Sequence, residues 1–461
     1  MRDDIKRRIE QIRRGEVPEG YKRIGGRIFP ESWSLNKIKD FAKTKSGKTP
    51  DRDRHSEFYQ GGNLNWFKTG ELLTKYLSNS EEKITPKALA LCGMPVFPKR
   101  SIILAMYGAT IGKASILDEN STTNQACCCI FPSSSYDTEY IFYQITFNRE
   151  AFVKISAGAA QPNINQSLVQ NFCLPLCETN EQNRIAEILS TCDRVIDLKK
   201  KLIEDKKKVK KWLMQTLLTG MIRVKDIENG IPYEELKKRI EQIRNGQVPE
   251  GYRKTELGII SHDWEITGLE KICKLIIDKR GKTPKQDSSD GDIPGLSAHN
   301  VRMGKIDFTF PTTYYSEDVF NRWMKNEKIE KEDIIMTTEA PLGNIALVEE
   351  TRKYILGQRV VALRLKDSVN SIFGKHLLMS NIFQRKLQEL ATGTTAKGLS
   401  KRNLKYLKVY IPDTETQKAV SSILSTADTE IDLLNKDLEQ WELKKKSLMQ
   451  LLLTGIVRIK A

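Results

Sequence analysis

The chain has 461 residues, of which 39% are hydrophobic and 29% charged, and its mean hydropathy is −0.46. This length allows two or three domains. The sequence lacks the run of about 18 apolar residues that a membrane-spanning helix needs. Its N-terminus, MRDDIKRRIEQIRRGE, also lacks the apolar core of a secretory signal. We therefore expect a globular protein of the cytoplasm that has no membrane partner.

The chain is strongly basic. Lysine and arginine number 75 against 59 acidic residues, which gives a formal charge of +16 and a pI of about 9.3. An excess of this size favours a polyanionic partner, and nucleic acid fits it better than a membrane surface does. A basic surface kept only for solubility is the alternative.

The sequence contains one layout twice. Residues 6–21 read KRRIEQIRRGEVPEGY and residues 237–252 read KKRIEQIRNGQVPEGY, with 13 of 16 positions identical. LMQTLLTGMIRVK at 213–225 returns as LMQLLLTGIVRIK at 448–460, with 9 of 13 positions identical. The segments between these ends differ almost completely, so we expect two divergent modules on one repeated scaffold.

The first predicted element of each copy is a short basic helix. It carries two isoleucines on one face, Ile9 and Ile12 in the first copy and Ile240 and Ile243 in the second. A glycine follows in each copy where the helix should stop.

The middle of each copy contains short apolar runs broken by Gly, Pro and Asn, such as 101–117 and 333–348. These runs predict β-strands joined by turns, and helices follow around Tyr140–Ile155 and Ile372–Leu390. The offset between copies is 231 at the heads (6 against 237), 234 at the GKTP motif (47 against 281) and 235 at the tails (213 against 448). We therefore predict one α+β fold for both modules.

A long helix closes each copy, from about Glu181 to Leu218 and from about Thr416 to Leu453. Apolar residues recur in both at the 4-3 spacing of a coiled-coil seam. The seam residues are Ile185, Leu189, Ile196 and Leu213 in the first helix and Val420, Leu424, Ile431, Leu438, Trp441 and Leu448 in the second. Lysines interrupt the seam, so packing there should be looser or shifted; they are Lys199, Lys206, Lys210 and Lys445.

Chain order predicts the direction of these helices, because the second must run back if it is to bury its seam against the first. The expected fold class is α+β: two α/β modules joined by two long antiparallel coiled-coil helices, with an internal pseudo-twofold repeat. The expected segments are an N-terminal repeat (1–22), module one (23–178), the central helix (179–222), a linker with the repeated short helix (223–252), module two (253–413) and the C-terminal helix (414–461).

The sequence offers no catalytic, cofactor or metal motif. GKT at 47–49 and 281–283 lacks the glycine five positions earlier that a phosphate-binding loop needs, since Ala42 and Ile276 stand there. Neither the four histidines nor the eight cysteines form a metal-ligand spacing that recurs with the repeat. We interpret the apolar Cys127–Cys129 run as a buried strand.

Loops rich in basic and amide side chains are more promising, because Arg, Lys, Asn and Gln bind phosphates and base edges. The candidates in module one are Lys45, Lys48, Arg52, Arg54, Lys99, Arg100, Gln161, Asn163 and Asn165. The candidates in module two are Lys279, Arg280, Lys282, Lys285, His299, Asn300, Arg302, Lys397, Ser400, Lys401 and Arg402. The loops 158–165 and 393–402 align at the offset of 235, which strengthens the prediction that both loops contact DNA.

The order of these features resembles the specificity (S) subunit of type I restriction–modification enzymes. The shared features are VPEGY followed by Trp33 or Trp264, then GKTP, a variable module, and a long helix that ends in LLTG. EGYRKTELGIISHDW at 250–264 is similar to the opening of a target-recognition domain in that family, whereas the first copy lacks KTELG. GQRVVAL (357–363) and NQACCCI (124–130) occupy similar strand positions.

The resemblance implies two target-recognition domains, each reading one half of a split, asymmetric DNA site, with the coiled coil as a ruler between them. It implies two modification subunits that carry S-adenosylmethionine and form an adenine-N6 methyltransferase. It also implies restriction subunits that cut DNA using ATP and Mg. On this hypothesis the present chain binds no cofactor, and the lysine-rich outer faces of the helices with the adjoining repeats contact the partners.

Two alternatives stay open. The chain could be a fused or stand-alone DNA methyltransferase or nuclease with two recognition arms, although it lacks methyltransferase motifs. It could also be a structural coiled-coil protein without a DNA partner, although the duplicated basic modules and the charge of +16 argue against this.

Overall fold

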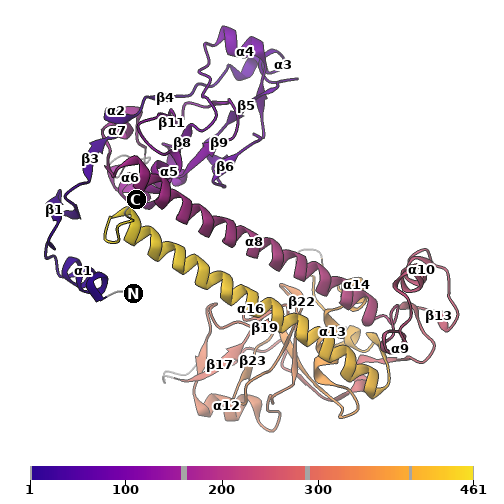
Figure 1. The fold of residues 1–461 in the computed structure, drawn as a ribbon. Coiled ribbons are helices and arrows are strands. Elements are labelled where there is room, and N and C mark those ends of the chain that lie inside the picture. The colour runs from indigo at the N-terminus through magenta and orange to yellow at the C-terminus, as the bar shows by residue number, and fades with distance from the viewer. Residues whose placement is uncertain (1–2, 157–162, 286–290, 394–396, 460–461) are drawn as a thin grey trace. The chain divides into compact units, whose positions relative to one another are not determined.

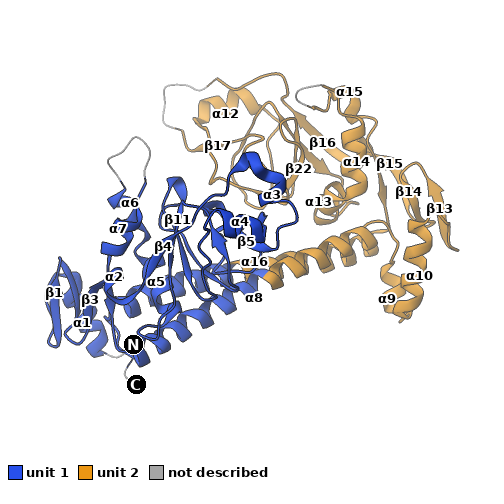
Figure 2. Ribbon diagram, turned by 90° about the horizontal axis from the view of Figure 1, so that it is seen from above, with its two compact units in different colours: residues 1–200, 436–461 blue, residues 201–435 orange. Residues whose placement is uncertain are grey.

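The structure is a computed structural model that describes residues 3–156, 163–285, 291–393 and 397–459. Its contacts divide the chain into two units, which Figure 2 colours separately. Unit 1 holds residues 1–200 and 436–461, and unit 2 holds residues 201–435. No helix in the described ranges has the length and apolarity to cross a membrane.

Unit 1 contains module one. Its shorter helices are α1 (Asp3–Arg13), α2 (Ile38–Phe41), α3 (His55–Phe58), α4 (Pro86–Leu91), α5 (Thr138–Phe147), α6 (Arg149–Ile155) and α7 (Gln166–Asn171). Its strands are β1 (Tyr21–Ile24), β2 (Arg27–Pro30), β3 (Ser34–Lys37), β4 (Thr44–Ser46), β5 (Leu64–Phe67), β6 (Tyr76–Leu77), β7 (Lys83–Ile84), β8 (Ile102–Ala105), β9 (Ala114–Leu117), β10 (Thr122–Thr123), β11 (Cys127–Ile130) and β12 (Cys173–Leu176).

Unit 2 contains module two. Its shorter helices are α9 (Val224–Glu228), α10 (Tyr233–Arg244), α11 (Leu269–Ile272), α12 (Glu317–Met324), α13 (Ser371–Met379), α14 (Asn381–Glu389) and α15 (Lys401–Leu404). Its strands are β13 (Tyr252–Thr255), β14 (Gly258–Ser261), β15 (Glu265–Gly268), β16 (Cys273–Asp278), β17 (Ile293–Leu296), β18 (Val301–Arg302), β19 (Lys305–Ile306), β20 (Tyr314–Tyr315), β21 (Ile334–Thr338), β22 (Leu342–Leu347), β23 (Ile355–Leu356), β24 (Val360–Leu365) and β25 (Lys408–Ile411).

The two modules share one core arrangement of strands, as the sequence predicts, and unit 1 adds β6 at the edge of its main sheet. The main sheet has the order β4-β11-β8-β9-β6 in unit 1 and β16-β24-β21-β22 in unit 2. A smaller sheet follows the order β10-β5-β7 in the first and β23-β17-β20 in the second, each with one parallel and one antiparallel pair. The predicted strand runs become β8 with β9 and β21 with β22, and the predicted helices become α5 with α6 and α13 with α14. Both modules are therefore mixed α and β.

The inner strands of each main sheet are buried because they are nearly continuous apolar runs. All four residues of β8 are buried, as are those of β11. Burial raises the pKa of the Cys128 thiol to about 12, so the cysteine run behaves as small apolar side chains. The interpretation of this run as a buried strand is confirmed.

Two long helices, α8 (Thr179–Leu217) and α16 (Thr414–Leu453), follow the modules close to their predicted positions. In unit 1, Ile185 and Leu189 near the start of α8 share an apolar cluster with Leu452 and Leu453 at the end of α16. In unit 2 the end of α8 shares a cluster with the start of α16. The two helices therefore run in opposite directions within each unit (Figure 1).

The lysines that interrupt the predicted seam are ion-paired with acids of the other helix. In unit 1, Lys199 pairs with Asp437 and Lys445 pairs with Asp193. In unit 2, Lys210 pairs with Asp428, and Lys206 lies 2.6 Å from Glu430. Packing in this stretch is polar, because the long lysine side chains reach carboxylates across the seam.

The repeated ends close in the same way in both units. The Tyr21 hydroxyl donates to the carbonyl of Gly455 at 2.8 Å, and the Tyr252 hydroxyl donates to the carbonyl of Gly220 at 2.6 Å. Both glycines have positive φ, +69° and +68°, which is why this turn requires glycine. The tyrosine of VPEGY thus holds the glycine of LLTG.

Candidate nucleic-acid interface

One end of the main sheet gathers most of the predicted DNA-binding loops in each unit. In unit 1, Cys127 at the start of β11 pairs with Ala105 at the end of β8, and Cys128 pairs with Ser46 at the end of β4. Since neighbouring strands are antiparallel, the turn after β4, the start of β11 and the loop after β8 meet at this end. In unit 2 the corresponding strands β16, β24 and β21 have the same arrangement.

The GKTP motif forms the turn after β4 or β16. Thr49 bonds through its hydroxyl to the Gln125 carboxamide, and Thr283 lies 3.1 Å from the equivalent oxygen of Gln358. A Cβ at Gly47 would stand 2.1 Å from the Thr123 carbonyl oxygen, so only glycine fits there. The threonine of the motif therefore links its turn to the segment just before the neighbouring strand, β11 in unit 1 and β24 in unit 2.

The lysine of the motif remains at the surface. Lys48 is exposed and donates to the Cys92 carbonyl at 3.3 Å, and Lys282 is exposed as well. These two are the equivalent basic groups that the two modules share at this sheet end.

The aligned loops also reach this end. Asn163 bridges to Tyr107 just after β8, and Gly398 bridges to Glu339 just after β21. The helices α7 and α15 begin immediately afterwards, with Asn165 and Ser400 as their N-caps.

The side-chain oxygens of Asn165 and Ser400 are used in capping hydrogen bonds. The Asn165 side-chain oxygen accepts from the Leu168 amide at 2.9 Å, and the Ser400 hydroxyl accepts from the Asn403 amide at 3.0 Å. Such bonds satisfy free amides of a first helical turn, so Asn165 and Ser400 have a structural role in their helices.

The arginines of module one are held by carboxylates. Arg52 makes a bidentate pair with Glu82 at 2.8 and 3.0 Å and lies over the Tyr59 ring at 4.4 Å. The hydrogen bond from Arg52 lowers the pKa of Glu82 to about 2. Arg54 pairs with Glu57 at 2.8 Å. Both arginines stay exposed, yet they would have to leave these partners to bind a phosphate.

Module two uses Arg280 inside its fold. Its guanidinium contacts both oxygens of Asp278 and donates to the carbonyl of Leu399, so it ties the GKTP turn to the 397–402 loop. Burial alone would raise the pKa of the Asp278 carboxyl, but the bonds from Arg280 outweigh burial and lower it. Lys279 lies 2.5 Å from Glu327, and Lys401 lies 3.8 Å from Asp278.

The candidates after β17 divide between surface and interior. His299 is exposed, whereas Asn300 is only 1% exposed and donates to the Thr312 hydroxyl at 2.9 Å. Arg302 is half-buried and lies 3.8 Å from the centre of the Phe310 ring. Only His299 of these three presents its side chain freely to solvent.

The remaining candidates are more scattered. Lys99 and Arg100 precede β8 and so lie at the opposite end of the sheet, where Arg100 is 3.9 Å from Glu139. Lys45 is exposed on the edge strand β4, and Gln161 lies outside the described residues. The other candidates are exposed; they are Asn163, Lys285, Lys397 and Arg402.

Three polar residues at the same sheet end escaped the sequence analysis. Gln125 and Gln358 hold the GKTP threonine, and Arg359 lies 4.0 Å from Glu339. In unit 2, Gln358 and Arg359 line a cleft of about 210 Å³ with Gly281. The signal was available, because GQ and NQ precede strands that were already aligned.

The predicted seam residues differ in burial. Six are buried: Ile185, Leu189, Ile196, Val420, Leu424 and Ile431. The other four are half-buried: Leu213, Leu438, Trp441 and Leu448.

Comparison with known proteins gives a consistent result. The type I restriction modification DNA specificity domain matches residues 30–205 and again residues 261–443. The type I restriction enzyme MjaVIII specificity subunit of Methanocaldococcus jannaschii is 28% identical over 453 residues, 96% of this chain and 97% of that protein. The putative MjaX specificity subunit of the same organism is 25% identical over 457 residues, again 96% and 97%.

A solved structure has the same fold. The type I restriction–modification S subunit from M. genitalium aligns with a TM-score of 0.53 at 16% identity, over 91% of this chain and 96% of that one. The family domain covers most of the present sequence, once in each copy of the repeat. The chain therefore belongs to the family of type I restriction–modification specificity subunits and carries two target-recognition domains.

Proposed function

We propose that the chain binds a bipartite, asymmetric site on double-stranded DNA. Residues 23–178 read one half-site and residues 253–413 read the other. The observation that carries this proposal is the equivalent sheet end of the two modules. Both present an exposed lysine there, Lys48 or Lys282, while the surrounding side chains differ. A common phosphate contact with different base-reading loops suits two different half-sites.

The base-reading groups that we propose are exposed polar and basic side chains in the loops of each module. They are Gln125 and Asn163 in module one, and His299, Gln358, Arg359, Lys397 and Arg402 in module two. Their donors and acceptors match those of base edges in the major groove.

The two long helices form an antiparallel coiled coil that sets the number of unread base pairs. This proposal rests on the opposed directions of α8 and α16 and on the ion pairs between them. At a rise of ~1.5 Å per residue, helices of 39 and 40 residues are roughly 60 Å long, a spacer of one or two turns of DNA.

Catalysis belongs to the partners of this chain in the cytoplasm. Two modification subunits, which bind S-adenosylmethionine and methylate adenine at N6, assemble on the repeated scaffold, and restriction subunits that use ATP and Mg join through them. The duplicated ends of the chain support a stoichiometry of two, because equal surfaces fit equal partners. The lysine-rich outer faces of the helices and the adjoining repeats contact these partners.

Mapping of methylated adenines tests the function. DNA from cells that carry this gene with its modification partner is compared with DNA from cells that lack only this gene. We expect a two-part motif with different halves that disappears in the deletion. Unchanged methylation would overturn the role in specificity, and a perfect palindrome would contradict two different readers. A purified chain that methylates or cuts DNA alone would overturn the division of labour.

A further inference from the structure

In unit 1 one carboxylate joins module one to both long helices. Asp193 of α8 forms an ion pair with Lys445 of α16. The other oxygen of Asp193 accepts a 2.5 Å hydrogen bond from the hydroxyl of Tyr143, a fully buried residue of α5. Lys75, just before β6, donates to the same hydroxyl at 2.9 Å. Asp193 therefore has one partner in the module and one on the opposite long helix.

Unit 2 has a carboxylate at the equivalent position. Asp428 of α16 stands at the offset of 235 from Asp193 and forms an ion pair with Lys210 of α8. On the module side, α13 brings the Lys375 ammonium within 3.8 Å of the carboxylate and Nε2 of His376 within 3.5 Å. In both units a carboxylate of one long helix thus lies against the opposite long helix and a helix of the module.

The ring that faces each carboxylate also occupies an equivalent position. Tyr143 is the sixth residue after Asp137, the N-cap of α5, and His376 is the sixth after Asn370, the N-cap of α13. Both rings are fully buried. Burial, together with the charge of Lys375, lowers the pKa of His376 to about 3, so this ring is neutral at neutral pH. The carboxylate and the lysine of the opposite helix stand at the same offset in both copies, whereas each module supplies a different ring.

Each carboxylate provides a second attachment of its module to a long helix. The first attachment is at the start of the helix, where Gln182 or Gln417 accepts a hydrogen bond from a module amide at 2.9 Å. The carboxylate lies eleven residues further along in both copies (182 to 193 and 417 to 428), which corresponds to ~16 Å along the helix axis. Two attachments this far apart keep a module from tilting along the helix.

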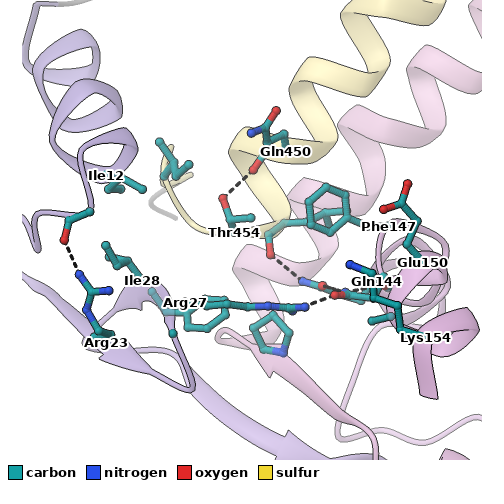
Figure 3. A pocket seen from close by; sticks show the side chains of 18 residues that line it. Ile12, Arg23, Arg27, Ile28, Gln144, Phe147, Glu150, Lys154, Gln450 and Thr454 are labelled. Carbon is teal, nitrogen blue, oxygen red and sulfur yellow. Dashed lines mark hydrogen bonds between the residues drawn. The ribbon is translucent and has the colours of Figure 1, made fainter. Parts of the chain in front are cut away.

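In unit 1, α5 is also bonded to the end of α16. The buried Gln144 carboxamide, next to Tyr143 in sequence, donates to the carbonyl of Leu453 at 2.9 Å (Figure 3). Asn148 at the end of α5 donates to the Gln144 carbonyl and accepts from Arg27 of β2 at 2.9 Å. Adjacent residues of α5 therefore contact different long helices, which defines the rotation of α5 as well as its tilt.

We propose that Asp193 and Asp428 are positioning residues, each of which fixes the orientation of its recognition domain on the long helices and so restricts the chain to one spacing between half-sites. This inference rests on the proposed function and adds the groups that hold each domain in place. The length of the helices sets a spacing only if the domains do not tilt, because a displacement of ~3.4 Å at a reading loop corresponds to one base pair. The two carboxylates are only 20% and 30% exposed, so water screens their interactions weakly.

Tyr143→Phe tests the inference, because it removes the bond from the module and leaves the Asp193–Lys445 pair in place. The full-length chain is assembled with the modification subunit. Methylation is measured on duplexes that carry the mapped half-sites at the natural gap and at gaps one base pair shorter or longer. We expect the preference in kcat/KM for the natural gap to fall roughly 10-fold, the scale of one hydrogen bond to a charged group. The preference for the correct bases within each half-site should not change.

Variants in unit 2 and matched controls make the experiment specific. Lys375→Met removes the charge that module two presents to Asp428, and it should reduce the gap preference about 3-fold, because an ion pair at 3.8 Å is weaker than a short hydrogen bond. Tyr136→Phe removes another buried hydroxyl of module one, whose bond to the Phe131 carbonyl stays within the module. Lys386→Met removes a lysine that pairs within α14. Both controls should keep the gap preference of the wild type.

The outcomes separate the inference from the function on which it rests. If Tyr143→Phe keeps the gap preference of the wild type, the positioning role is overturned and the proposed function stands. The same holds if Tyr136→Phe reduces the preference as much as Tyr143→Phe does, because the effect would then follow from lost stability. If the wild-type complex methylates duplexes with and without the half-sites alike, the proposed function fails and the inference fails with it.

Discussion

Some residues of the GKTP turn stabilise the fold, whereas others are free to contact DNA. Gly47 is required by a close backbone approach, and the threonine holds a glutamine of the next strand. Arg280, just before the second motif, is committed to Asp278. The motif lysine stays exposed in both modules, so it is the basic residue of the motif that is available to DNA.

Lys282→Ala should weaken DNA binding to all sequences alike. A lysine that neutralises one phosphate releases about one counterion, so the slope of log affinity against log salt should fall by about one. Titration by fluorescence anisotropy at several salt concentrations measures this slope. Lys331→Ala, an exposed lysine before β21 at the opposite sheet end, is the control and should leave it unchanged. An unaltered slope for Lys282→Ala would remove this lysine from the interface.

Residue types alone could not separate readers from structural residues. Arg280, Asn300, Asn165 and Ser400 have the chemistry of DNA contacts, yet the structure uses them in an ion pair, a buried bond and two helix caps. Capping depends on where a helix starts, and burial depends on distant chain segments. Gln358 was missed for the converse reason: one glutamine before a strand carries no signal by itself, and only its alignment with Gln125 of the other copy singles it out.

At the scale of the element, both long helices are anchored by an equivalent glutamine. Gln182 accepts from the Asp137 amide and Gln417 from the Asn370 amide, both at 2.9 Å. Each also donates to a carbonyl before its helix, Cys177 at 2.8 Å or Pro412 at 2.9 Å. The start of each helix is therefore bonded to its module.

Gln417→Leu should destabilise unit 2 by about 2–3 kcal/mol, because it leaves buried backbone groups without partners. Gln417 is 1% exposed, so water does not replace the lost bonds. The free energy of unfolding is measured by urea titration with circular dichroism. Lys418→Leu, on the neighbouring exposed position, should change it by less than about 0.5 kcal/mol. Equal effects of the two substitutions would contradict the anchoring role.

The helices were well predicted because their apolar period is long and uninterrupted by proline. The ion pairs of the seam lysines were not predicted, because they depend on which carboxylates of the other helix face these lysines. Asp437 and Glu430 become partners of Lys199 and Lys206 only in an antiparallel register, which one helix cannot reveal. The fold of the modules was predicted as a class, while their strand order required the structure.

For the whole molecule, the repeat separates what is constant from what varies. The scaffold ends keep their bonds in both copies, as the tyrosine–glycine contacts show, whereas the loops at the sheet ends differ. A change in the helices should therefore alter the spacing of the half-sites without altering their bases.

Four residues inserted in α8 just after Lys206, together with four inserted in α16 just before Glu430, should lengthen the unread spacer. Matched insertions keep the Lys206–Glu430 and Lys210–Asp428 pairs in register. Four residues add about 6 Å along the helix axis, which corresponds to one or two base pairs at ~3.4 Å each. Mapping of methylated adenines in cells that carry the variant reads the result directly.

If the length of the helices sets the spacing, the methylation map of the variant must show two results. Both half-sites must keep their bases, and the gap between them must grow. Changed bases in either half would mean that the helices take part in reading. An unchanged gap would mean that something other than the length of α8 and α16 sets the spacing. The insertion in α8 alone serves as the control, because it breaks the register of the ion pairs and should lower the melting temperature instead of giving a new, well-defined gap.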